Sequence, residues 1–284
     1  MAWSIKRRLE FIDFRLYWEG RINRSDIKNF FGISIPQASA DLRKYIEIAP
    51  NNIDYDKSGK FYYATDEYKP IFTSPDTSEY LSQLRLLSAN IITKEESFLG
   101  AIPSFDITPN PIRSVNSEIL RTILKAIREK MSLEIEYQSM SRENPTWRRI
   151  APHTLAFDGF RWHIHAYCFT RESFRDFLFA RILHVRNFQP VEIDSTANIE
   201  WNNFLSVKIA PHPDLTDSQR KIIEADYGMV DGYATIQVRS ALYFYFEKQF
   251  RLDKGCKSRP AKEQQITLLN REEIEKKRSL LKSN

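Results

Sequence analysis

The residues of this sequence best suited to contact another molecule begin at Ser34. Ser34 and Gln37 have the spacing of a capping box, which predicts the start of a helix. Ala38, Leu42 and Tyr45 recur at helical spacing and form the inward face of that helix. The opposite face suits a DNA groove, because Gln can bond an adenine edge, Arg can bond a guanine or a phosphate, and Ser can approach closely. The candidate DNA contacts on this helix are Ser34, Gln37, Ser39, Arg43 and Lys44.

Two short apolar runs after this helix predict a β-hairpin. Residues 53–55 and 61–63 are strand-like, and a polar, basic stretch, 56–60, joins them. Lys57 and Lys60 lie in that stretch, where their ammonium groups could touch the phosphate backbone. We therefore expect both lysines to contribute to DNA binding.

From Ser132 onward, apolar and polar residues alternate, which predicts a β-sheet. Strand-like runs occupy residues 133–137, 147–150, 154–157, 161–167 and 175–183, with a turn at Asp158-Gly159. Trp162 and Ile164 should face one side, and Arg161, His163 and His165 the other. Arginines in half-buried strands need partners, so these strands predict a concave basic pocket or an ion-pair network.

Metal binding and catalysis have little support in the sequence. His163 and His165 with Cys168 resemble a metal cluster only superficially, because no second ligand pair follows at finger-like spacing. A hydrolase pairing Ser139 or Ser141 with His153 is conceivable, but nothing in the sequence positions such a pair. The phosphate-binding glycine motifs and the nucleophile-elbow motif are missing. We expect no metal, no cofactor and no enzymatic activity.

The helix that begins at Ser34 needs a scaffold, and the preceding residues predict one. A first helix carries a single apolar stripe, formed by Ile5, Leu9, Ile12 and Leu16. Gly20 ends it, Asn23 with Asp26 caps a second short helix, and Gly32 ends that one. Three such helices followed by a hairpin indicate a winged helix-turn-helix over residues 1–70, whose third helix enters a major groove. The alternative is a helical protein–protein module with a solvated polar face.

The rest of the chain predicts an α+β protein with several domains. Residues 71–118 contain a short amphipathic helix at 80–87 and a linker, 93–115, that prolines punctuate. Asn116 can cap a further helix, whose wide apolar face packs against a domain or a second subunit. The sheet falls within residues 119–192, and residues 200–284 alternate between strand and helix patterns, as in a small α/β unit.

Composition agrees with a protein that meets phosphate groups. The net charge is +5, and positive charge is concentrated in residues 1–70, 121–190 and 254–284. A solvated basic surface without a partner would look the same. Two cysteines cannot form a disulfide framework, no apolar run is long enough to span a membrane, and the first residues lack the pattern of a signal peptide. We therefore expect a cytoplasmic protein.

The strand region resembles a known domain. The run RRIAPHTLAFDGFRWHIHAYC, followed by FRDFLFARI, is similar to the WYL domain, named for a Trp-Tyr-Leu triplet that here reads Trp162-His163-Ile164. Flanking positions also match, at Arg149, Pro152, Arg175, Phe177, Arg181 and Ile182. Over its whole length the chain resembles WYL-domain transcriptional regulators with an N-terminal winged helix-turn-helix, of the BrxR and CapW type. His163 takes the place of the tyrosine of the triplet, and Ile164 that of the leucine.

The resemblance implies a homodimeric repressor of a bacterial anti-phage defence operon, such as BREX or CBASS, that binds an inverted-repeat operator. The WYL domain would be an SH3-like or Sm-like barrel that binds a nucleic-acid or nucleotide-like effector, which relieves repression. A small C-terminal α/β extension of the WCX kind would contribute to dimerisation. The ligand-binding residues implied are Tyr137, Ser139, Ser141, Arg149, Trp162, His163, Arg175 and Arg181.

Three alternatives stay open at this stage. The polar side chains of the sheet would only satisfy one another inside the barrel. Otherwise, the chain would be an RNA- or single-strand-binding adaptor that acts mainly through its WYL domain, and the N-terminal module would dock a protein. The third alternative is a nucleotide-processing enzyme, which would show turnover of a nucleotide.

Overall fold

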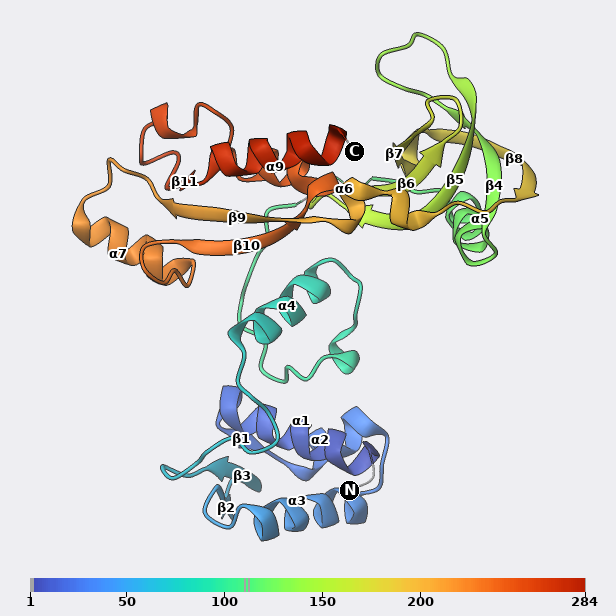
Figure 1. Ribbon diagram of the computed structural model, residues 1–284. Coiled ribbons are helices and arrows are strands. Elements are labelled where there is room, and N and C mark those ends of the chain that lie inside the picture. Colours follow the sequence, from blue (N-terminus) through green and yellow to red (C-terminus); the bar gives the residue numbers. More distant parts are fainter. Residues whose placement is uncertain (1–2, 110, 112, 284) are drawn as a thin grey trace. The chain divides into compact units, whose positions relative to one another are not determined.

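A computed structural model describes residues 3–109, 111 and 113–283. The chain forms two compact units, which divide after Pro109 (Figure 1). The elements of the first unit are α1 (Trp3–Glu19), β1 (Arg21–Ile22), α2 (Arg24–Phe31), α3 (Ile35–Ile48), β2 (Ile53–Asp56), β3 (Phe61–Ala64), α4 (Thr77–Ser88) and the 3-10 turn η1 (Lys94–Glu96). Its strands form one antiparallel sheet in the order β1-β3-β2. This unit is a winged helix-turn-helix with the β2–β3 hairpin as its wing.

Local capping explains why the first three helices begin and end where they do. Asn23 and Asp26 form the predicted capping box of α2, and Gly32 ends this helix in the left-handed conformation with φ 63°. Ser34 caps α3 by accepting the N–H of Gln37. The capping box predicted for Ser34 is only half formed, because the Gln37 side chain bonds Asp41 instead.

The core of the first unit forms where the apolar stripes predict it. The fully buried side chains include Leu9, Ile12, Ile27, Ala38, Leu42 and Tyr45. Phe98 and Leu99 also belong to this core, although they fall in the stretch expected to be a linker. The ring of Phe98 contacts three phenylalanines, Phe11, Phe14 and Phe30. The segment after α4 therefore folds back onto the winged helix domain.

The buried carboxylate of Asp13 ties α1 to the chain that leaves the wing. Its Oδ2 accepts the backbone N–H groups of Ile71, Phe72 and Thr73 at 2.8–3.0 Å. Its Oδ1 accepts the Tyr45 hydroxyl at 2.6 Å. Burial, with this hydrogen bond to Asp13, raises the pKa of Tyr45 well above its ordinary value, so the hydroxyl stays a donor.

The second unit begins with a helix and an antiparallel sheet. Its first elements are α5 (Ser117–Arg128), β4 (Met131–Tyr137), β5 (Thr146–Phe157), β6 (Trp162–Cys168), β7 (Ser173–Leu178), the 3-10 turn η2 (Phe179–Arg181) and β8 (Ile182–Pro190). Asn116 caps α5 as predicted. The helix α5 lies against the sheet (Figure 1). Ile119 and Ile123 belong to the core that it shares with the strands.

The five strands run in the order β7-β6-β5-β4-β8, and no pairing joins β7 to β8 among the described residues. The sheet is therefore open, and the closed barrel expected for this domain is not formed. The strand predicted over residues 175–183 is interrupted by η2, which separates β7 from β8.

The rest of the second unit has the small α/β fold that the sequence predicts. Its elements are the 3-10 turn η3 (Ser195–Ala197), α6 (Ile199–Asn202), β9 (Phe204–Pro211), α7 (Asp217–Asp226), β10 (Ala234–Arg239), η4 (Ser240–Leu242), α8 (Tyr243–Gln249), η5 (Cys256–Ser258), β11 (Ile266–Leu268) and α9 (Arg271–Ser283). The strand order is β10-β9-β11, and α9 lies along β9 (Figure 1). The α+β fold class is thus confirmed. Within the described part of the chain, no helix is long and apolar enough to cross a membrane.

Candidate functional site

The third helix of the winged helix domain carries two basic side chains that have no bonding partner within the described residues. Arg43 is exposed and Lys44 half-buried, and neither side chain makes a hydrogen bond or an ion pair within the described residues. Because Leu42 and Tyr45 hold the inward face of α3, both cations stay on its outer side. They are therefore available to a phosphate or a base edge.

The other candidate residues of α3 already have local partners. The Ser34 hydroxyl caps the helix, and the Ser39 hydroxyl donates to the carbonyl of Ile35 at 2.9 Å. The Gln37 amide donates to Asp41 at 3.2 Å. Each of these groups would have to exchange a partner, or use its second hydrogen-bonding atom, to contact DNA.

Arg8 of α1 neutralises the negative charge of an acidic side chain of α3. Arg8 donates twice to the Asp41 carboxylate, at 2.6 Å and 3.2 Å, so it compensates the negative charge that would otherwise repel phosphate. The sequence gives little sign of this role, because Arg8 looks like any solvated helix residue.

The wing presents its two predicted lysines to solvent. Lys57 and Lys60 are exposed, and their side chains have no partner in the described chain. Asp56 shapes the tip by accepting the N–H groups of Ser58 and Gly59 at 2.8 Å and 3.0 Å. Lys60 adopts a left-handed conformation with φ 58°, which closes the turn.

A pocket of about 230 Å³ opens at one end of the five-stranded sheet. Its lining comes from the β5–β6 hairpin, the end of β7, the η2 turn and the residues before α5, namely Arg113, Val115, Phe157, Phe160, Arg161, Trp162, Leu178, Ala180 and Arg181. We call it the arginine pocket after Arg113, Arg161 and Arg181. No acidic side chain lines it among the described residues.

Three large aromatic side chains of the arginine pocket remain exposed to solvent. Phe157, Phe160 and Trp162 are 49%, 58% and 51% exposed, and the rings of Phe157 and Trp162 lie 5.0 Å apart. One guanidinium group can donate two parallel hydrogen bonds to the oxygens of a phosphate, and aromatic rings can stack on nucleic-acid bases. The combination is suited to a ligand that carries both a phosphate and a planar ring.

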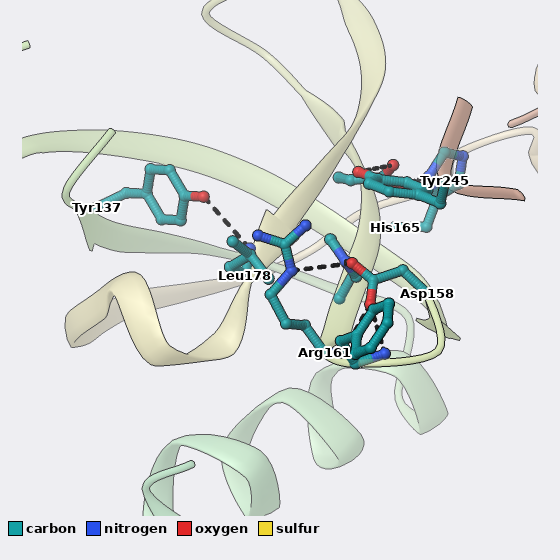
Figure 2. A network of polar contacts seen from close by, with 9 residues as sticks. Tyr137, Asp158, Arg161, His165, Leu178 and Tyr245 are labelled. Atoms are coloured by element: carbon teal, nitrogen blue, oxygen red, sulfur yellow. Dashed lines mark hydrogen bonds and ion pairs between the residues drawn. The ribbon is translucent and has the colours of Figure 1, made fainter. Parts of the chain in front are cut away.

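Behind the arginine pocket lies a buried acid in the β5–β6 turn. Asp158 accepts the Nε–H of Arg161 at 2.9 Å, and its other bond on the same oxygen is to His163 Nε2 at 2.8 Å (Figure 2). Burial acts to raise the pKa of the Asp158 carboxyl, but the hydrogen bonds from His163 and from the turn outweigh it and lower the pKa to about 2. Asp158 is thus ionised at neutral pH, and it orients Arg161.

The structure does not gather all the ligand-binding residues expected from the family resemblance. Only Trp162 and Arg181 line the arginine pocket. His163 is buried and does not line the pocket. The Tyr137 hydroxyl accepts the N–H of Leu178, a lining residue, at 3.2 Å (Figure 2).

The remaining expected ligand residues lie elsewhere on the sheet. Arg149 pairs with Glu134 at 3.3 Å, and Arg175 bonds the hydroxyl of Ser173. The hydroxyls of Ser139 and Ser141 bond each other at 3.1 Å, in an exposed loop. None of these four side chains reaches the arginine pocket.

Sequence reasoning missed several residues of the arginine pocket. Phe157, Phe160 and Arg161 flank the Asp158-Gly159 turn, and this clustering of aromatic and basic residues around a turn was the available signal. Arg113 lies in the expected linker and had no such signal. Within the described chain, no group of three or more His, Cys, Asp or Glu side chains could hold a metal, and Cys168 and Cys256 are buried free thiols.

A winged helix-turn-helix followed by a sheet of this kind defines a class, the WYL-domain regulators. Three family models match the chain accordingly. Residues 4–86 match the winged helix-turn-helix domain of the BrxR transcriptional regulator, residues 118–187 the WYL domain, and residues 204–274 the C-terminal dimerization domain of BrxR.

Comparison with individual relatives identifies the family within this class. The DNA-binding transcriptional repressor CapW of Stenotrophomonas maltophilia is 41% identical over 277 residues, which cover 96% of this chain and 92% of that protein. The repressors of the same name from Pseudomonas aeruginosa and Escherichia coli are 39% and 38% identical over 272 residues. Each alignment covers 96% of this chain and 91% of the relative. The chain therefore belongs to the CapW family. None of these names is that of an enzyme, in agreement with the sequence-based expectation.

Solved structures also match the chain. The proteasome accessory factor PafBC of Arthrobacter aurescens aligns with 96% of this chain and 45% of its own, at 15% identity and a TM-score of 0.30. Similarity at this level carries no argument about fold or function.

Proposed function

We propose that this protein is a homodimeric DNA-binding transcriptional repressor that inserts α3 into the major groove of an inverted-repeat operator. The observation that carries the proposal is the pair of cations on the outer side of α3, exposed Arg43 and half-buried Lys44, whose side chains have no partner in the described residues. The chain also aligns with CapW repressors over nearly its full length. The wing lysines would add phosphate contacts. Residues 1–70 would bind DNA, 71–118 connect, 119–192 sense an effector, and 200–284 dimerise.

The effector is proposed to be nucleic-acid or nucleotide-like and to bind in the arginine pocket. Three guanidinium groups and three exposed aromatic rings around one opening support this choice. An effector releases DNA only if it prefers the conformation that binds the operator less well. Relief of this kind would suit a cytoplasmic repressor of an anti-phage defence operon.

A mobility-shift titration tests the DNA-binding part. The purified protein is titrated against the DNA upstream of its own gene, with random duplex and single-stranded competitors at one salt concentration. We expect the operator to be preferred over random duplex by about 10³ or more. Arg43→Ala should weaken operator binding by roughly tenfold to a hundredfold and leave the dimer intact.

Arg85→Ala is the matched control, because Arg85 is an exposed arginine on α4 whose side chain has no partner in the described residues. It should leave operator affinity unchanged. If Arg43→Ala behaves like Arg85→Ala, α3 is not the DNA-reading helix.

The second candidate function is a single-strand-binding adaptor that acts through the arginine pocket. The exposed aromatic rings favour it, because stacking on bases tolerates any sequence. In that case binding would follow the single-stranded competitor, and Trp162→Ala would abolish it while Arg43→Ala would not.

A further inference from the structure

The β5–β6 turn separates two parts of the second unit. On one side, Phe160 and Arg161 line the arginine pocket. On the other side, the turn packs against α8, so closely that a Cβ on Gly159 would lie 2.9 Å from the Nε2 atom of Gln249. Any movement of this turn therefore changes both the wall of the arginine pocket and the contact with α8.

The Asp158 carboxylate holds the turn in place through four contacts. Its Oδ1 accepts the backbone N–H groups of Phe160 and Arg161 at 2.9 Å and 2.7 Å. Its Oδ2 accepts the Nε–H of Arg161 and contacts His163 Nε2. Among the described residues, no carboxylate pairs with Arg113 or Arg181. Arg161 is therefore the one pocket arginine that forms an ion pair with a carboxylate of the described chain.

Further polar contacts continue from the turn to the C-terminal elements. The ring of His163 lies 4.8 Å from the ring of Tyr245 on α8. The Tyr245 hydroxyl donates to Asp176 Oδ2 at 3.0 Å, and Asp176 Oδ1 lies 2.5 Å from His165 Nδ1 (Figure 2). The His165 ring stacks on Trp201 of α6 at 4.9 Å.

These contacts leave little freedom to the groups involved. His163 and His165 are buried, and burial is the main reason that the pKa of Tyr245 lies above its ordinary value. A buried carboxylate that loses a donor is strongly destabilised, so the turn must rearrange if Arg161 leaves Asp158.

We propose that Arg161 couples the arginine pocket to α8, by exchanging its bond with Asp158 for a bond with an anionic ligand. The ligand's phosphate competes with the carboxylate for one guanidinium. Once Arg161 turns to the ligand, the Asp158–His163 pair and the Gly159 backbone lose their fixed contact with Tyr245 and Gln249. This inference rests on the proposed effector site and adds the route by which its occupancy reaches the C-terminal region. Linkage then requires that the state of α8 also change the affinity of the arginine pocket.

Hydrogen–deuterium exchange on the full-length protein tests the coupling, with a short 5′-phosphorylated single-stranded DNA as the probe. In the unchanged protein, saturating probe should slow exchange at residues 157–162 and accelerate exchange of the α8 amides by about tenfold. Arg161→Ala should remove this response of α8, even when the probe saturates the arginine pocket.

Arg113→Ala is the matched control, because Arg113 lines the same pocket and has no partner in the described chain. It should weaken probe binding, yet the α8 response should persist at saturation. A merely structural role of Arg161 would not separate these two variants. The proposal is overturned if the probe protects residues 157–162 of the unchanged protein while α8 exchange stays the same.

Variants without any probe separate this inference from the effector proposal. Arg161→Ala and Tyr245→Phe should each accelerate α8 exchange by about tenfold in the free protein, and Arg161→Lys replaces the alanine variant if that one unfolds. If the probe protects nothing, the effector proposal fails for that class of ligand, and these free variants decide the coupling. Unchanged α8 exchange in them would then refute it.

Discussion

Arg181 is the last residue of the η2 turn. It lines the arginine pocket, and its guanidinium has no partner within the described residues. Arg181→Ala should leave operator binding in place and reduce the apparent affinity for the effector by about tenfold, because one charge-assisted phosphate contact is lost. The measurement is an effector titration against the preformed operator complex.

Arg175→Ala provides the comparison for Arg181, because Arg175 is an exposed arginine on β7 outside the arginine pocket. Its effector response should match that of the unchanged protein. A fall in melting temperature for Arg181→Ala, together with loss of operator binding, would assign that arginine a structural role instead.

His153 should make stability depend on pH below neutrality. Burial, and then the neighbouring His165, lower the pKa of His153 from 6.5 to about 4. The unfolded chain therefore takes up a proton first as the pH falls, so the stabilising contribution is present above about pH 6.5 and is lost on the way to pH 4. Urea unfolding at several values between these limits should show the free energy of unfolding falling with pH.

His153→Gln should flatten that pH dependence. His184→Gln serves as its control, because His184 is an exposed histidine paired with Glu136 at the sheet surface. If both variants keep the slope of the unchanged protein, the acid sensitivity arises elsewhere.

The residue-level prediction was limited by strand register. Arg149 was expected in the ligand site, but β4 and β5 pair so that Glu134 stands directly opposite Arg149. A cross-strand ion pair is then the nearest partner for that arginine. The sequence shows which residues alternate along a strand, but it does not show which residue of the next strand lies opposite, so pocket and ion pair could not be distinguished.

The wing makes a prediction at the scale of an element. Replacing both Lys57 and Lys60 by Ala should weaken binding to every duplex alike, because phosphate contacts carry no sequence information. The slope of log affinity against log salt should become shallower by about two phosphate equivalents. Fluorescence anisotropy over a salt series measures this. If the double variant instead changes the preference for operator over random DNA, the wing lysines contact base edges and not only phosphates.

Lys69→Ala is a suitable control for the wing, since Lys69 is exposed in the same unit and only its backbone forms hydrogen bonds in the described chain. Its salt slope should equal that of the unchanged protein.

Elements with local signals were predicted well, and elements set by distant contacts were not. Caps and terminal glycines defined α2 and the start of α3, because those signals act within one turn. The η2 turn divides an apolar run that contains neither Gly nor Pro, so the run looked like one strand. Phe98 and Leu99 lie in a stretch without helical or strand periodicity, and only tertiary packing with α1 and α2 reveals them as core.

At the scale of the whole molecule, the division after Pro109 predicts independent folding. The first unit has its own core, which includes Phe98 and Leu99. A fragment of residues 1–109 should therefore unfold cooperatively and bind operator DNA as a monomer, about a hundredfold or more weaker than the full chain, because the second unit's proposed dimer contacts are gone. Analytical ultracentrifugation and thermal unfolding check both statements.

A fragment of residues 1–90 is the informative counterpart, because it ends before Phe98 and Leu99. It should be clearly less stable than residues 1–109, since two buried apolar side chains are missing from its core. Equal stability of the two fragments would show that the folded-back segment contributes little to the domain.

The open sheet of the second unit bears on how the protein avoids aggregation. An unclosed sheet leaves edge strands with free hydrogen-bonding groups, which can recruit strands from other molecules. On the edge strand β8, His184 and Arg186 place polar or charged groups along the strand, Asn187 interrupts its extended path with φ 54°, and Pro190 ends it without an N–H to donate. These features oppose fibril-like stacking of neighbouring copies, so a WYL domain that is not closed as a barrel can exist at high local concentration without seeding an aggregate.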